Sequence, residues 1–197
     1  SRNAKYIKPF INGFKGWLQT DEYPGYETAL KEHNLLFPDD KIIHVACLAH
    51  VRRKFYDSSI NGTSPGAGKA LKYIQQIYKK EEDILNLNLS PEELVLKRKE
   101  IIKPIFDDFH EWLIEMQPKI PPSLKFGRAI SYALSSWQHL LNYLDCPDLF
   151  VDNSISERAI KPFVIGSKNW LFAGSETGAE SSCFIFTLIE NAKLYKL

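Results

Sequence analysis

The sequence predicts a mainly helical α/β protein in which a short strand–helix–strand unit is followed by a long helical segment. Two short apolar runs, 17–20 and 41–46, have the length and composition of buried strands. Between them, apolar residues recur at helical spacing over 26–36. After residue 50 the strand signals vanish for about a hundred residues, and amphipathic helical patterns replace them. These observations indicate an α/β fold that carries a large all-helical insertion.

The composition suits one sizeable domain or a domain with a large insertion. With 197 residues, of which 44% are hydrophobic, the chain can bury a real core. Its 25 basic and 24 acidic side chains leave a net charge of only +1, so any contact with nucleic acid must come from local clusters. Cys47, Cys146 and Cys183 are too widely spaced for a disulfide framework and fit a reducing cytoplasm. We see no signal peptide or membrane-spanning run, and we expect a cytoplasmic protein without membrane contact.

The first elements are a helix over 5–14 and a strand over 17–20 that ends at Asp21. Gly16 separates the helix from the strand. The Pro24-Gly dipeptide predicts a turn. The helix and the second strand named above complete the unit.

The insertion is expected to begin with a helix over 49–58 and a Gly/Ser/Pro loop over 61–68. An amphipathic helix follows this loop. Ser90 begins another helix as its N-cap, with proline at the first helical position and Glu93 closing a capping box. Pro104 should kink or divide that helix.

Prolines within 118–122 interrupt the helical pattern, and the clearest apolar stripe follows over 126–144. Such a stripe normally packs in the core. A helix over 153–161 then returns to the first part of the chain, 170–173 forms a short extended piece, and 177–180 caps a final helix.

Two carboxylates occupy positions from which they could do chemistry. Asp21 lies where a buried strand meets a turn, so it can be held rigidly and still reach a cleft. An ordinary turn aspartate explains the same position. Glu157 completes a capping box that starts at Ser154, and a surface pair with Lys161 also accounts for it. The residues alone leave these alternatives open.

Four ordered segments resemble blocks of one known family: Leu18–Tyr26, Cys47–Phe55, Asp152–Arg158 and Gly166–Ser175. Together they are similar to the catalytic region of bacterial transposases of the insertion sequence 66 family, which belong to the three-carboxylate (DDE) transposases. The resemblance implies a partial ribonuclease H-like fold that lacks its first strands. This fold would occupy 1–48 and 151–197, and an all-helical insertion would occupy 49–150.

The resemblance implies that Asp21 and Glu157 are catalytic and bind metal, with two Mg²⁺ or Mn²⁺ ions in the complete enzyme. The reaction would be cleavage of DNA phosphodiesters at transposon ends, followed by joining of these ends to target DNA. The first catalytic Asp would precede the Asp21 strand, so we expect this chain to begin after it and to be inactive as an isolated piece. Glu22 stands where the family usually has Gly. Because neighbours on a strand point to opposite faces, we expect Asp21 and not Glu22 to enter the site.

The two catalytic residues are far apart in the sequence, at 157 − 21 = 136 positions. A shared site therefore requires that the ends of the insertion, near residues 50 and 150, lie side by side. His50 and Asn153 are candidates for orienting the site, although a buried, hydrogen-bonded histidine explains His50 equally well. A zinc site at Cys47-x-x-His50 lacks the paired ligands that structural zinc needs.

Basic residues near these blocks are candidates for binding DNA phosphates: Arg52, Arg53, Lys54, Arg158, Lys161 and Lys168. A solvated helix face explains such residues as well. The resemblance implies transposon ends and target DNA as partners. It also implies a homo-oligomer of the full-length protein on DNA, associated with the nucleoid when bound. The alternatives are a non-catalytic helical DNA-binding or interaction module and another nuclease of the ribonuclease H-like fold.

Overall fold

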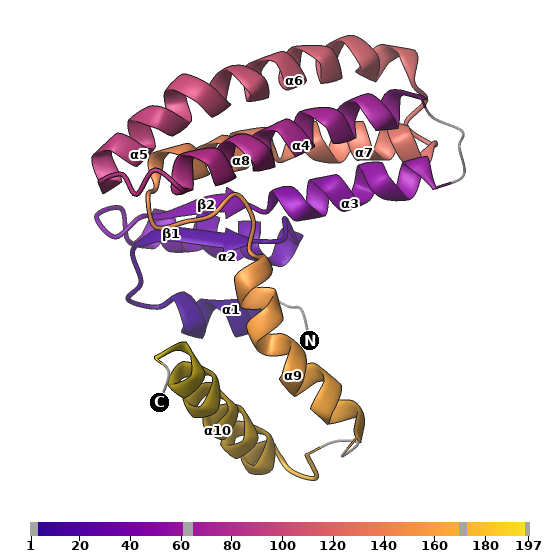
Figure 1. The fold of residues 1–197 in the computed structure, drawn as a ribbon. Helices are drawn as coiled ribbons and strands as arrows, with labels where there is room; N and C mark the ends of the chain where they lie inside the picture. The colour runs from indigo at the N-terminus through magenta and orange to yellow at the C-terminus, as the bar shows by residue number, and fades with distance from the viewer. Residues whose placement is uncertain (1–3, 61–64, 170–172, 196–197) are drawn as a thin grey trace. The chain divides into compact units, whose positions relative to one another are not determined.

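The computed structural model describes residues 4–60, 65–169 and 173–195. The chain forms two compact units, Ser1–Asn153 and Ser154–Leu197, and each is described by itself. The first unit contains both the predicted strand–helix–strand part and the helical insertion (Figure 1). Among the described residues, no helix has the length and apolar character needed to cross a membrane.

The strand–helix–strand unit forms as predicted. Its elements are α1 (Ala4–Ile11), β1 (Gly16–Thr20), α2 (Pro24–Leu36) and β2 (Ile42–Ala46). The two strands pair in parallel, with Leu18 opposite His44. The predicted turn at Pro24 is wrong, because Pro24 is the first residue of α2, where its fixed φ and missing N–H are tolerated.

The insertion is helical throughout its described residues. Its elements are α3 (Leu48–Ser59), α4 (Pro65–Leu85), α5 (Pro91–Lys97), the π-helical turn η1 (Arg98–Ile102), α6 (Lys103–Met116), the 3-10 turn η2 (Gln117–Lys119), α7 (Lys125–Ser135), α8 (Trp137–Leu141) and the 3-10 turn η3 (Asn142–Asp145). In Figure 1, α4 to α8 gather on one side of the sheet and α1 and α2 lie on the other. The sheet therefore has a hydrophobic core on each side. Val45 packs into the helical core, and Ile42 packs with Leu30 of α2.

The predicted helix start at Ser90 is confirmed in detail. The Ser90 hydroxyl accepts a hydrogen bond from the Glu93 backbone N–H, and the Glu93 carboxylate accepts one from the Ser90 N–H at 2.9 Å. Pro104 divides the helix as expected, since the π-helical turn η1 lies just before it. The apolar stripe over 126–144 also packs in the core, where Ile130 is completely buried.

The predicted loop over 61–68 is wrong in its second half, because α4 already begins at Pro65. Gly66 allows close packing there. A Cβ atom built on Gly66 would lie 2.6 Å from the Phe126 ring of α7. Glycine in this segment therefore reflects the close approach of two helices and not a loop.

Side chains from the helices cover the free edge of β2. Gly16 donates its N–H to the Lys41 carbonyl, so the backbone groups of Ile42 and His44 face away from β1. Asn34 of α2 exchanges two hydrogen bonds with the Ile42 backbone, at 2.8 and 2.9 Å. Asn142 of η3 donates to the His44 carbonyl at 2.8 Å. These contacts close an edge that could otherwise pair with another strand.

A buried ion pair holds the segment that leaves the insertion. Arg98 is fully buried, and its guanidinium bonds the Glu81 carboxylate at 2.5 Å. The same guanidinium donates to the carbonyls of Cys146 and Leu149, at 2.7 and 2.8 Å. Arg98 therefore anchors the chain directly after η3.

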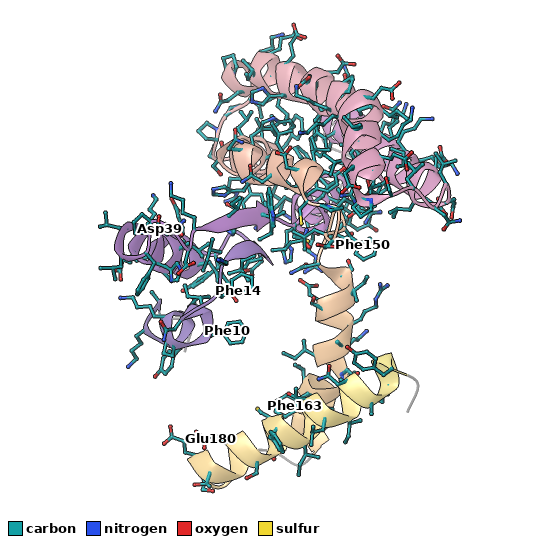
Figure 2. All side chains as sticks on the ribbon, turned by 90° about the vertical axis from the view of Figure 1, so that its left-hand side faces the viewer. Phe10, Phe14, Asp39, Phe150, Phe163 and Glu180 are labelled. Atoms are coloured by element: carbon teal, nitrogen blue, oxygen red, sulfur yellow. The ribbon has the colours of Figure 1, made fainter. Side chains whose placement is uncertain are left out.

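The second unit consists of two helices, α9 (Ser154–Asn169) and α10 (Glu176–Leu194). Phe163 of α9 meets Phe186 of α10 at a centroid distance of 5.1 Å (Figure 2). The returning helix is longer than predicted. The expected extended piece lies mostly at residues 170–172, outside the described residues. The N-cap of α10 is Ser175, two residues earlier than expected.

Candidate active site at the carboxyl end of the sheet

The two ends of the insertion lie side by side, as a shared site requires. The Leu48 N–H at the start of α3 donates to the Val151 carbonyl at 3.1 Å. The Gln19 side chain of β1 donates to the Phe150 carbonyl at 2.9 Å. The segment that leads to Glu157 is therefore bonded directly to the strand that leads to Asp21.

Further contacts fix the end of this segment. The Asn153 N–H donates to the Cys47 sulfur at 3.5 Å, and the Tyr78 hydroxyl donates to the Asp152 carboxylate at 2.5 Å. Burial and this hydrogen bond raise the pKa of Tyr78, so the phenol stays protonated as a donor. Burial also raises the pKa of Cys47, which disfavours the thiolate that zinc needs. His50 lies half-buried in the first turn of α3.

Asp21 and Glu22 both follow the last residue of β1, so strand alternation does not decide which way they point. Asp21 is half-buried. The Glu22 side chain is only 13% exposed and faces two histidines, one on β2 and one on α8.

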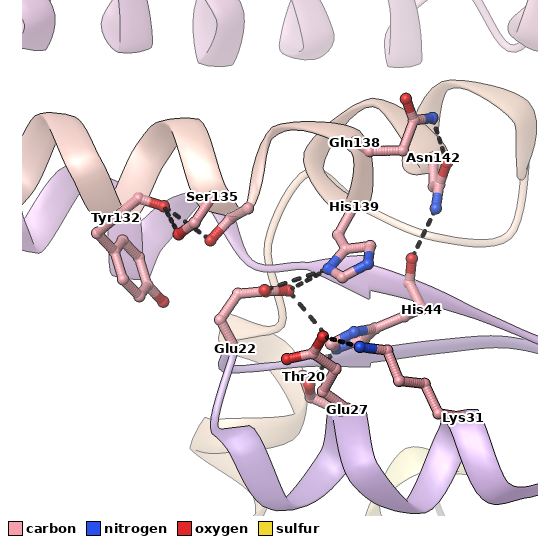
Figure 3. A network of polar contacts seen from close by, with 11 residues as sticks. Thr20, Glu22, Glu27, Lys31, His44, Tyr132, Ser135, Gln138, His139 and Asn142 are labelled. Atoms are coloured by element: carbon pink, nitrogen blue, oxygen red, sulfur yellow. Dashed lines mark hydrogen bonds and ion pairs between the residues drawn. The ribbon is translucent and has the colours of Figure 1, made fainter. Parts of the chain in front are cut away.

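Figure 3 shows how this cluster is built from three elements. His139 Nδ1 of α8 lies 3.0 and 3.1 Å from the two Glu22 carboxylate oxygens. His44 Nε2 of β2 lies 3.6 Å from the nearer of these oxygens and 2.7 Å from the Thr20 hydroxyl. The two imidazole rings are 4.4 Å apart between centroids.

The two histidines experience opposite electrostatic effects. Burial lowers the pKa of His44, and the nearby Glu22 only partly offsets this change. The hydrogen bond from Glu22 raises the pKa of His139 against a smaller effect of burial. These opposite shifts make His139 easier to protonate than His44.

The sequence analysis did not predict the two histidines of this cluster. They are 139 − 44 = 95 positions apart, on a strand and on a helix, and no motif spacing connects them. Only the packing of α8 against β2 brings them together.

The predicted basic run on α3 is exposed, and basic residues of a second helix, α7, lie beside it. Arg52, Arg53 and Lys54 all face solvent. Lys54 lines a groove together with Lys125 and Arg128 of α7. Spacing could not link these residues, because about seventy positions separate the two helices in the sequence.

The remaining predicted site residues belong to the second unit. Glu157 lies in the first turn of α9 and is exposed, as are Arg158 and Lys161. The side chain of Lys168 is outside the part of the chain that the structure describes. Asp21 and Glu157 thus belong to different units, and their pairing stays a prediction.

Comparisons with known proteins show which family this chain belongs to. The family model described as "Transposase IS66 family" matches residues 1–181. Two uncharacterized proteins of Sinorhizobium fredii, y4hP and y4qI, are each 31% identical over 98% of this chain. The chain spans about a third of their length, 36% and 35% respectively. No solved structure matches significantly. The family match covers most of the sequence, and the chain therefore belongs to the IS66 family of transposases.

Proposed function

We propose that this chain forms part of the catalytic region of a DDE transposase, with Asp21 and Glu157 as two of its three catalytic carboxylates. The family match over residues 1–181 is the observation that carries the proposal. The reaction would cut DNA phosphodiesters at the ends of a mobile element and join these ends to target DNA. Its nucleophiles would be water and then a free DNA 3′-hydroxyl.

The geometry of the first unit supports a shared site. Hydrogen bonds fix Asn153 next to Cys47, and Glu157 follows Asn153 by four residues. Four residues span at most about 14 Å even when fully extended. Asp21 follows Gln19, which is itself bonded to the returning segment. These bonds within the first unit support the proposal that both carboxylates contribute to one site.

The unpaired edge of β1 is where a strand that carries the third carboxylate would pair. Among the described residues, β1 pairs only with β2, and the backbone groups of Trp17 and Gln19 face the opposite edge. A further strand that pairs there would lie directly beside the strand that leads to Asp21. This arrangement fits the expected ribonuclease H-like sheet, in which the first Asp would come from that strand.

The donor chemistry of the two carboxylates fits Mg²⁺ or Mn²⁺, which prefer oxygen ligands and keep several waters. Asp21 is half-buried and Glu157 is exposed, so both can be reached by a hydrated ion. When bound, a pair of such ions would activate the attacking oxygen and stabilise the leaving oxygen. Asp21 and Glu157 would hold the ions in place and would form no covalent bond to DNA.

The groove between α3 and α7 is our proposed phosphate-binding surface. Lys54, Lys125 and Arg128 place three cations along it against the single carboxylate of Asp57, while the whole chain carries a net charge of only +1. Such a local cluster can bind the DNA backbone and releases counterions in doing so. Replacing Lys125 and Arg128 with Gln should weaken DNA binding and reduce its dependence on salt.

The test is cleavage of transposon-end DNA by a full-length transposase that carries this chain. Asp21→Asn and Glu157→Gln should each abolish cleavage in Mg²⁺ and Mn²⁺ while DNA binding persists. Asp39→Asn and Glu180→Gln change exposed carboxylates outside the proposed site and serve as matched controls. Full activity after Glu157→Gln would refute the assignment. Cleavage without strand transfer would identify a different nuclease, and DNA binding without cleavage would identify a non-catalytic module.

A further inference from the structure

The Glu22, His44 and His139 side chains have the geometry of an incompletely closed metal site. They come from the end of β1, from β2 and from α8. One potential ligand atom from each residue lies within 4.8 Å of the other two. In a tetrahedral zinc site with bonds of about 2.0–2.2 Å, ligand atoms are about 3.4 Å apart. The most distant ligand atoms therefore need to approach each other by at most about 1.4 Å to surround an ion.

We propose that Glu22, His44 and His139 bind one Zn²⁺-class transition-metal ion. Two imidazoles and one carboxylate suit Zn²⁺ and its transition-metal neighbours, whereas Mg²⁺ prefers oxygen ligands. Three protein ligands leave a fourth position open for water or another small ligand. This ligand set does not include Asp21 or Glu157, although Glu22 directly follows Asp21 in the chain, and the proposal does not rest on the proposed function.

The burial of the three side chains combines enclosure with an entry path. His44 and Glu22 are 8% and 13% exposed, while His139 is 29% exposed. The first two ligands are thus held inside the protein, and the ion can enter along His139. Among the described residues, these three form the only cluster of His, Cys, Asp and Glu groups close enough to hold a metal.

Neighbouring residues fix the positions of the ligands. Asn142 follows the helix that carries His139 and donates to the His44 carbonyl at 2.8 Å, so it ties the two histidine-bearing elements together. Thr20 bonds His44 Nε2 at 2.7 Å. Metal binding at this nitrogen would replace that hydrogen bond.

The alternative is that the cluster of Glu22, His44 and His139 binds protons and no metal ion. Without an ion, the three side chains form a half-buried hydrogen-bonded network in which Glu22 pairs with His139. The two states differ in whether added metal binds with defined stoichiometry and whether all three side chains contribute to its affinity.

The experiment is titration of the 197-residue chain with ZnCl₂ by calorimetry, and with CoCl₂ by visible absorption, in millimolar Mg²⁺. We expect one Zn²⁺ per chain and a Co²⁺ spectrum of a tetrahedral or five-coordinate site with nitrogen and oxygen ligands. Glu22→Gln and His139→Gln should each weaken Zn²⁺ binding by at least about 10-fold, the lower limit for changes in residues that merely support a ligand. Circular dichroism shows whether each variant retains its helical fold.

Glu27→Gln is the matched control, because Glu27 is an exposed carboxylate of α2 that is bonded to Lys31 and stands near the cluster (Figure 3). It should leave Zn²⁺ affinity unchanged. Unchanged binding in folded Glu22→Gln and His139→Gln, or thiolate-to-cobalt bands from cysteine ligands, would overturn the proposal. Absence of binding in millimolar Mg²⁺ would overturn it too. None of these results bears on cleavage by Asp21 and Glu157, so failure of either proposal can be recognised separately.

Discussion

The helical insertion and the carboxyl end of the sheet differ in how completely their ionisable side chains are buried and hydrogen-bonded. In the insertion, Arg98 and Glu81 are almost fully buried, and the guanidinium donates to the Glu81 carboxylate and to three backbone carbonyls. At the sheet end, Glu22 and its two histidines stay partly accessible, and the histidines can change protonation. A fully satisfied cluster fixes one conformation, whereas a partly satisfied one can still accept a ligand. We therefore regard the insertion as the scaffold and the carboxyl end of the sheet as the proposed site of chemistry.

The largest expected effect comes from breaking the buried pair of the scaffold. Arg98→Met should lower the free energy of unfolding by about 3–5 kcal/mol, because it leaves Glu81 buried without its partner. Lys97→Met removes the neighbouring exposed pair with Glu100 and should cost about 1 kcal/mol or less. Urea unfolding measures both. Equal losses would contradict the structural role of Arg98.

Close packing in the scaffold gives the next effect. A Cβ atom on Gly127 would lie 2.2 Å from the Pro121 carbonyl oxygen, so Gly127→Ala must shift the backbone. We expect a loss of about 1–3 kcal/mol in thermal or urea unfolding. In α4, Gly68→Ala meets no atom within 4 Å and should be neutral or stabilise the helix by up to about 1 kcal/mol. A stable Gly127→Ala variant would show that this region is less tightly packed than the structure indicates.

At the sheet end the cost should be smaller. His139→Gln removes a hydrogen bond to the Glu22 carboxylate from a side chain that is 29% exposed. We expect a loss of about 1–2 kcal/mol in metal-free buffer. A double-mutant cycle with Glu22→Gln isolates the coupling between the two side chains. If His139→Gln lowered the free energy of unfolding as much as Arg98→Met does, the proposed difference between the insertion and the sheet end would be wrong.

The smallest effect should come from the cap of α5. Ser90→Ala should cost about 1 kcal/mol. The hydrogen bonds from Ser90 lower the pKa of Glu93 below its ordinary value of 4.5. The Glu93 contribution is therefore fully present above about pH 4.5 and is lost as the pH falls through the lowered pKa. The stability difference between the parent and Ser90→Ala should therefore be constant above about pH 4.5 and shrink as the pH falls below it, and a difference that grows on acidification would contradict the assignment.

The sequence predicts the scaffold well because its signals are local. Capping chemistry locates the start of α5, and apolar periodicity locates the core stripe that includes Ile130. The same local signals mislead where a residue serves a distant contact. Gly66 resembles a loop residue, but it is a helical residue whose missing side chain makes room for Phe126.

The candidate site is only partly predictable for the same reason. Family motifs predict Asp21 and Glu157 as site residues, and a shared site requires the ends of the insertion to meet, as Leu48 and Val151 do. Nothing in the local sequence connects His44 with His139, because their contact depends on how α8 packs along β2.

The most direct test of the account is anomalous X-ray scattering from crystals of a full-length transposase that carries this chain, bound to transposon-end DNA with Mn²⁺ and Zn²⁺. The account predicts a Mn²⁺ peak shared by the carboxylates of Asp21 and Glu157, and a separate Zn²⁺ peak among Glu22, His44 and His139. Asp21 and Glu157 far apart, with no Mn²⁺ ion between them, would contradict the proposed active site.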